Sequence, residues 1–110
     1  MDEIIQNFKL GNPVIVLDDF DRENEADIII PGQFATAEII NKFIRNSTGI
    51  ICVPMTESRA IELGLTQMVR NNTDPNKTNY TISCDAITCT TGVSAEDRTC
   101  LLYTSDAADE

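Results

Sequence analysis

The segment DDFDRENEAD, residues 18–27, places six carboxylates and one arginine within ten residues. Glu23, Glu25 and Asp27 alternate in it, so in extended backbone their side chains would point to one face. Two carboxylates about 6 Å apart repel by roughly 2–3 kcal/mol at an effective dielectric of about 20, and a bound cation would offset that cost. Because the chain contains no histidine, such an all-oxygen site favours Mg²⁺ or Mn²⁺. The segment therefore predicts a divalent-cation site, with a hydrated acidic turn as an equal alternative.

Arg22 has two possible uses within this segment. It could neutralise a neighbouring carboxylate, or it could keep its guanidinium for a phosphate group. An EF-hand loop that starts at Asp19 is excluded, because its sixth position would be Asn24 rather than glycine and its twelfth Ile30 rather than glutamate.

The acidic segment lies between two aliphatic runs, residues 14–17 and 28–30, which predict buried strands. Further strands are predicted at residues 49–53 and 80–84. Thr36, Thr56 and Ser94 are typical of helix N-caps, and Gly49 and Gly64 are predicted to end the first two helices. This order of elements predicts a layered domain that mixes helices and strands.

The length and charge of the chain limit its fold and partners. At 110 residues it can form one modest core, and its formal charge of −10 disfavours nucleic acid and anionic membrane surfaces. No apolar run approaches the roughly 20 residues that span a bilayer, and the N-terminus lacks a signal-peptide pattern. We therefore expect a cytoplasmic protein without nucleic-acid or membrane partners. The four cysteines form no C-x-x-C pair, which argues against a structural zinc site.

The last residues, CLLYTSDAADE, differ in character from the sequence before them. They resemble the translation of a sequencing adapter read through at the end of a short DNA fragment. We therefore expect natural sequence to end near Thr99, with a truncated domain over residues 1–99 and a non-native tail over residues 100–110.

Four segments stand in order over residues 14–98: VIVLDDFDRENEADIII, TGIICVPMT, MVRNNTDPNKTNYTISCDA and TTGVSAEDR. Together they resemble the N-terminal half of the 3,4-dihydroxy-2-butanone 4-phosphate synthase family of riboflavin biosynthesis, over about residues 10–99. The resemblance implies a lyase that converts D-ribulose 5-phosphate to 3,4-dihydroxy-2-butanone 4-phosphate and formate with Mg²⁺ or Mn²⁺. It also implies a three-layer α+β fold with a mixed β-sheet, of which this chain holds the N-terminal portion, and a homodimer.

The resemblance also assigns roles to residues of this chain. Glu23 is implied as the metal ligand. The implied catalytic residues are Glu23, Glu25, Asp27 and Cys52, and the implied substrate contacts are Arg22, Glu23, Asp27, Thr91 and Ser94. For Cys52 a structural role in a buried strand is about equally favoured, and helix capping explains Ser94 equally well.

The chain departs from the family pattern in three respects. Phe20 replaces an acidic residue, and Ala26 replaces a glycine, which would strain the loop if that position needed a positive φ. The family's later blocks, which carry a metal-binding histidine and a second catalytic glutamate, are missing, so we expect negligible synthase activity from residues 1–110 alone. Two alternatives stay open: a non-catalytic acidic module that binds divalent cations, and a parent protein that also carries a GTP cyclohydrolase II domain.

Overall fold

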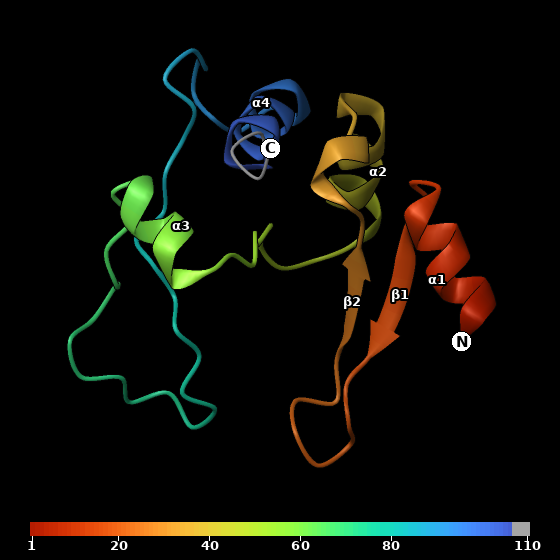
Figure 1. The fold of residues 1–110 in the computed structure, drawn as a ribbon, viewed down its shortest axis with the longest axis horizontal. Coiled ribbons are helices and arrows are strands. Elements are labelled where there is room, and N and C mark those ends of the chain that lie inside the picture. Colours follow the sequence, from red (N-terminus) through yellow and green to blue (C-terminus); the bar gives the residue numbers. More distant parts are fainter. Residues whose placement is uncertain (107–110) are drawn as a thin grey trace.

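The computed structural model describes residues 1–106 as four α-helices, a short 3₁₀ helix and a two-stranded sheet (Figure 1). In chain order these elements are α1 (Asp2–Lys9), β1 (Val14–Leu17), β2 (Ala26–Ile29), η1 (Gly32–Phe34), α2 (Ala37–Asn46), α3 (Glu57–Glu62) and α4 (Ala95–Asp106). The α+β class is confirmed, and the described residues contribute a two-stranded antiparallel sheet to it.

The three predicted helix N-caps are confirmed. The hydroxyl oxygen of Thr36 accepts from the Ile39 backbone N–H at 3.2 Å, and Thr56 and Ser94 make the equivalent bonds at the starts of α3 and α4. Each bond satisfies one of the backbone donors that a helix leaves unpaired in its first turn. Gly64 ends α3 with a φ of +72°, as predicted.

The helices differ from the prediction in two respects: where α2 ends, and the presence of α1. Helix α2 ends at Asn46 rather than near Gly49, because Ser47 already adopts extended backbone. Helix α1 was not predicted at all. Asp2 and Glu3 in its first turn and Lys9 in its last turn complement the helix dipole, a signal that the N-terminal segment does carry.

Strands β1 and β2 form an antiparallel hairpin in which Val14 pairs with Ile29 and Leu17 with Ala26. The predicted strands are therefore present, but their predicted burial is wrong. Ile15 and Leu17 are 69% and 77% exposed, and Ile28 and Ile29 are also exposed. A hairpin of this length has aliphatic side chains on both faces, and within residues 1–106 helix α1 contacts β1 but leaves most of these side chains exposed.

The core lies where α4 packs against α2 and η1, above the hairpin in Figure 1. Ala35, Ile40 and Leu102 are buried in it, with Ile30 and Phe43 packed around them. The exposed area of the chain is 8877 Å². A compact monomer of 12.1 kDa would expose about 6,000 Å². The core is therefore small for the length of the chain.

The strands predicted at residues 49–53 and 80–84 are wrong. Residues 49–53 are irregular, and Ile50 is 77% exposed. In the second segment Thr81 forms one isolated bridge with Gln67. Aliphatic alternation favours a strand only where a neighbouring strand supplies the ladder of hydrogen bonds. Residues 49–53 have no such neighbour among the described residues, and residues 80–82 pair only briefly with residues 66–68.

Residues 100–106, from the predicted non-native tail, continue helix α4, and Leu102 enters the core. The rest of that tail, residues 107–110, lies outside the described residues. Whether residues 100–110 are foreign to the domain stays a prediction. Within residues 1–106, no helix has the length and apolar character needed to cross a membrane.

Candidate functional site

The loop that joins β1 to β2 is closed by Asp18. One carboxylate oxygen of Asp18 accepts from the Asp19 backbone N–H, and the other accepts from the Glu23 backbone N–H, both at 2.8 Å. The Asp18 backbone N–H donates to the Glu25 carbonyl at 2.9 Å. An aspartate that bonds backbone donors ahead of it is a common way to fold a tight turn. The loop therefore has a defined shape before any ligand is considered.

The Asp18 carboxylate also binds Arg22. The Arg22 Nη1 lies 3.1 Å from the Asp18 Oδ2, and its Nη2 lies 3.6 Å from the Glu23 Oε1. The charge of Asp18 raises the pKa of the Arg22 guanidinium. The first use predicted for Arg22, neutralising a carboxylate, is thus seen, and the half-exposed guanidinium stays accessible to a second anion.

The predicted convergence of Glu23, Glu25 and Asp27 on one face is wrong. Asn24 has a φ of +53°, so the backbone reverses between Glu23 and Glu25 instead of running extended. Asp27 lies within β2 opposite Val16. Among residues 1–106, no group of three or more acidic or cysteine side chains is arranged to hold a metal ion. An acidic module that binds a cation by itself is therefore not supported by the described residues.

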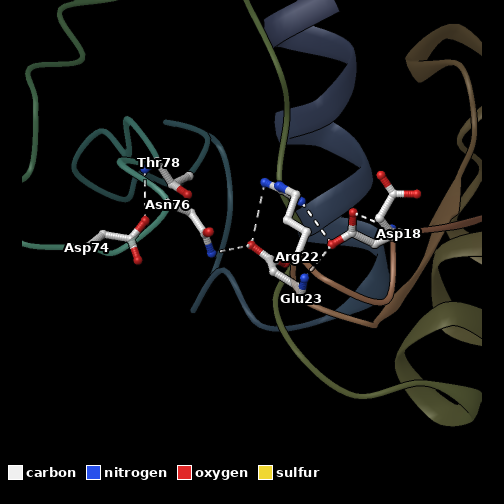
Figure 2. A network of polar contacts seen from close by, with 7 residues as sticks. Asp18, Arg22, Glu23, Asp74, Asn76 and Thr78 are labelled. Carbon is white, nitrogen blue, oxygen red and sulfur yellow. Dashed lines mark hydrogen bonds and ion pairs between the residues drawn. The ribbon is translucent and has the colours of Figure 1, made fainter.

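A second loop reaches the acidic loop from far along the chain. The Asn76 side-chain amide donates to the Glu23 Oε1 at 3.2 Å, across 53 positions of sequence (Figure 2). In Figure 1 the hairpin loop and the segment around residue 76 both lie at the lower edge of the molecule. The contact joins Glu23, the implied metal ligand, to a loop that no feature of the sequence links to the acidic segment.

The donor chemistry of Glu23 fits a divalent cation, although it supplies only one ligand. Its side chain is 36% exposed, and its Oε1 is held by Arg22 and Asn76. Within residues 1–106 no hydrogen bond to its Oε2 is found, so that oxygen is available to a hard cation. The remaining ligands of a complete site would have to come from substrate, water or further protein.

Three implied site residues, Cys52, Thr91 and Ser94, lie far from Glu23 in sequence. Cys52 is exposed in the irregular segment between α2 and α3, so the buried-strand alternative for it is wrong. Thr91 is exposed in the loop before α4. The Ser94 hydroxyl oxygen caps α4, as the structural alternative predicted. No hydrogen bond or ion pair within residues 1–106 joins these three residues to the acidic loop.

The loop before α4 is held by Asp97. Its carboxylate accepts from the Thr90 hydroxyl at 2.7 Å and from the Gly92 backbone N–H at 3.2 Å. Several hydrogen bonds lower the pKa of the Asp97 carboxyl, and the bond from the Thr90 hydroxyl contributes most. Gly92 has a φ of +82°, and a Cβ there would overlap the Asp85 carboxylate. This position therefore requires glycine for its backbone and for the close approach of Asp85.

Two residues that depart from the family pattern have simple positions. Phe20 is 82% exposed at the tip of the acidic loop, where it covers nothing within the described residues. Ala26 is the first residue of β2 and does not have a positive φ, so its side chain causes no backbone strain. The residue in the left-handed region is Asn24, a type that tolerates it well.

The sequence did not identify Asp18, Asp74 or Asn76 as parts of the site. Asp18 and Asp74 are typical turn residues at the start of their loops, a signal that predicts their local hydrogen bonds. No comparable signal links Asn76 to Glu23, because a contact between two irregular loops leaves no periodic pattern. The polar network thus extends beyond the acidic segment by residues that only the fold brings together.

We expect the stability that Asp18 provides to depend on pH. The Glu23 backbone N–H is the largest cause that lowers the pKa of Asp18 below its ordinary value of 3.8, with burial opposing it. A carboxylate whose pKa is lowered in the folded state stabilises the fold when the pH is above its unfolded-state pKa. This contribution is lost as the pH falls through the folded-state pKa. The urea midpoint of the chain should therefore exceed that of Asp18→Asn at neutral pH. This difference should shrink only below pH about 4. A difference that grows on acidification would contradict this assignment.

Known proteins match the chain over most of its length. The family model for 3,4-dihydroxy-2-butanone 4-phosphate synthase matches residues 2–109. A protein of that name from Pyricularia oryzae is 50% identical over 98 residues, which cover 87% of this chain and 42% of the relative. Another from Histophilus somni is 48% identical over 95 residues, covering 86% of this chain and 45% of the relative.

A solved structure shows the same arrangement of the backbone. It is a 3,4-dihydroxy-2-butanone 4-phosphate synthase in complex with two magnesium ions. It superposes with a TM-score of 0.89 at 46% identity, covering 94% of this chain and 49% of that chain. The likeness thus includes the hairpin, the loops and the helices together.

The chain has helices around a small antiparallel sheet and an ordered acidic loop on the hairpin. It is therefore an α+β protein of the same class as these relatives. The chain belongs to the 3,4-dihydroxy-2-butanone 4-phosphate synthase family. It spans about half the length of the relatives that it matches.

Proposed function

We propose that this chain supplies the acidic-loop half of a 3,4-dihydroxy-2-butanone 4-phosphate synthase site. The reaction divides the five carbons of D-ribulose 5-phosphate between a four-carbon ketone phosphate and formate. Membership of the family and the ordered Arg22–Glu23 pair on the acidic loop carry this proposal. Because the chain spans about half the length of its relatives, activity is assigned to a protein that contains the rest of the site.

Glu23 is proposed as the ligand through which this chain holds Mg²⁺ or Mn²⁺. The exposed carboxylate and the oxygen chemistry of its Oε2 support this role. When bound, the cation would act as a Lewis acid that stabilises negative charge developing on the ketone oxygen. One relative whose structure has been solved was crystallised with two magnesium ions, which also supports a divalent cation here.

Arg22, Glu25 and Asp27 are proposed to act on the sugar phosphate. Arg22 keeps N–H donors beyond those that bind Asp18 and Glu23, and these can orient an anionic or hydroxyl group of the substrate. Glu25 and Asp27 follow the turn at Asn24 and carry carboxylates that can accept and return protons during enolisation. Their separation from Glu23 by that turn lets them serve the substrate rather than the cation.

Cys52, Thr91 and Ser94 are proposed to complete the substrate contacts. Cys52 is exposed and would lie against the sugar. Thr91 presents an exposed hydroxyl at a loop ordered by Asp97, and the Ser94 hydroxyl caps the start of α4, where backbone donors suit a phosphate. These roles require the loop before α4 to face the acidic loop across the bound substrate.

We also propose a cytoplasmic homodimer for the protein that contains this chain. The family resemblance supports both assignments. The aliphatic side chains of the hairpin are exposed, and the exposed area of the chain exceeds that of a compact monomer. Both observations support an apolar partner that covers the hairpin, either another part of the same chain or a second chain.

The proposal is tested with a hybrid chain: residues 1–99 of this sequence followed by the unmatched later part of the Histophilus somni relative. We expect the hybrid chain to release formate from ribulose 5-phosphate in the presence of Mg²⁺, and the 110-residue chain alone to release none above background. Formate is measured with a coupled dehydrogenase assay. A folded hybrid chain without formate release would count against the proposal.

A further inference from the structure

We propose that Asn76 is a positioning residue for Glu23: its amide fixes one carboxylate oxygen so that the other faces the cation. The observation that carries this inference is the 3.2 Å hydrogen bond from the Asn76 Nδ2 to the Glu23 Oε1. The inference rests on the proposed role of Glu23 as a metal ligand and adds a residue that this role does not include.

Hydrogen bonds within the loop around Asn76 give this loop a defined shape. The Asn72 side chain spans the loop: its Oδ1 accepts from the Asp74 backbone N–H at 2.9 Å, and its Nδ2 donates to the Thr78 carbonyl at 2.8 Å. The Asp74 carboxylate accepts from the Thr78 backbone N–H at 2.8 Å (Figure 2). That bond is the largest cause that lowers the pKa of Asp74. Hydrogen bonds therefore fix the backbone of this loop on both sides of Asn76.

The polarity of the contact fixes its direction. A carboxylate accepts hydrogen bonds only, so the amide nitrogen of Asn76 must face Glu23. The Arg22 Nη2 lies 3.6 Å from the same Oε1 atom, so both donors hold one oxygen. The two oxygens of a carboxylate are equivalent, so the contact fixes the plane of the Glu23 carboxylate and thereby the direction in which its other oxygen presents free lone pairs.

The neutrality of Asn76 matters for a metal ligand. A lysine in its place would neutralise Glu23 and compete with a cation, whereas an amide orients the carboxylate and leaves its charge intact. Hydrogen-bond partners of metal ligands generally change metal affinity by 10–100-fold when they are removed. Because Glu23 is partly exposed, we expect the lower end of this range for Asn76.

The test measures Mn²⁺ binding by the full 110-residue chain. Paramagnetic broadening of the Glu23 amide resonance, followed against Mn²⁺ concentration, gives an apparent Kd at this site rather than over the whole acidic surface. We expect Asn76→Ala to raise that Kd about tenfold. The matched control is Asn79→Ala, an exposed asparagine of the same loop, which should leave the Kd unchanged. Unshifted Thr78 and Asp74 amide resonances would show that the loop frame persists in the variant.

Glu23→Gln separates this inference from the proposed function. If Glu23→Gln removes the broadening and Asn76→Ala leaves the Kd at its original value, Glu23 is a ligand and Asn76 does not position it. If Glu23→Gln also leaves the Kd unchanged, the metal role of Glu23 fails, and the positioning role fails with it. A Kd raised equally by Asn76→Ala and Asn79→Ala would assign the effect to the loop as a whole and overturn the specific role of Asn76.

Discussion

Glu23→Gln is expected to lower formate release by the hybrid chain about a thousandfold, because Lewis-acid stabilisation worth several kcal/mol is lost with the cation. The substitution keeps the shape of the side chain and its Oε1 acceptor, so the hydrogen bond from Asn76 can persist, whereas the ion pair with Arg22 is lost. It removes the negative charge that a divalent cation requires. The measurement is kcat for formate release at saturating substrate and Mg²⁺.

A matched control keeps this result specific. Glu38→Gln removes a carboxylate from the exposed face of α2, where Glu38 lies 3.8 Å from Lys42 in a pair that contributes little to stability. We expect its kcat to match that of the unmodified hybrid chain. Near-normal turnover in Glu23→Gln, with the fold intact by circular dichroism, would remove Glu23 from the mechanism.

Ile40→Ala is expected to unfold most of the 110-residue chain. Ile40 is 1% exposed and belongs to a core in which three buried residues do most of the packing. Truncating a buried isoleucine to alanine costs about 2–5 kcal/mol. A small domain with much exposed apolar surface has little stability to lose, so this cost is comparable with the whole free energy of unfolding. Far-UV circular dichroism and the dispersion of amide resonances measure the loss.

The control for this prediction lies one helical turn away. Ile44 is on the same helix but is 38% exposed, so Ile44→Ala should lower the free energy of unfolding by less than about 1 kcal/mol. Equal losses in the two variants would show that helix α2 is held by something other than burial of Ile40 against α4.

Local signals in the sequence predicted the local structure well. Thr36, Thr56 and Ser94 start helices because each hydroxyl oxygen can accept a hydrogen bond within its own first turn. The aliphatic runs on either side of the acidic segment pair with each other because a short loop brings them together. These predictions depend on neighbours in sequence and needed no knowledge of the remaining fold.

Predictions that depend on distant partners were less successful. Residues 49–53 have the composition of a strand but lack a neighbouring strand within residues 1–106. The alternation of Glu23, Glu25 and Asp27 failed as a geometric argument because Asn24 takes up a left-handed conformation between them. Asn76 could not have been predicted as a partner of Glu23, since the two loops meet only after the chain between them has folded.

The contact between Asn76 and Glu23 also depends on the stability of the rest of the fold. Closing a loop of 53 residues costs roughly 3.5 kcal/mol in chain entropy. A hydrogen bond to a charged group returns only about 1.5–3 kcal/mol. The bond therefore cannot close the loop alone, so packing elsewhere in the fold, such as that of α2 against α4, must supply the rest of the free energy. The orientation of the Glu23 carboxylate thus depends on packing that it does not contact, so a substitution confined to the core can disorder the cation ligand without touching it.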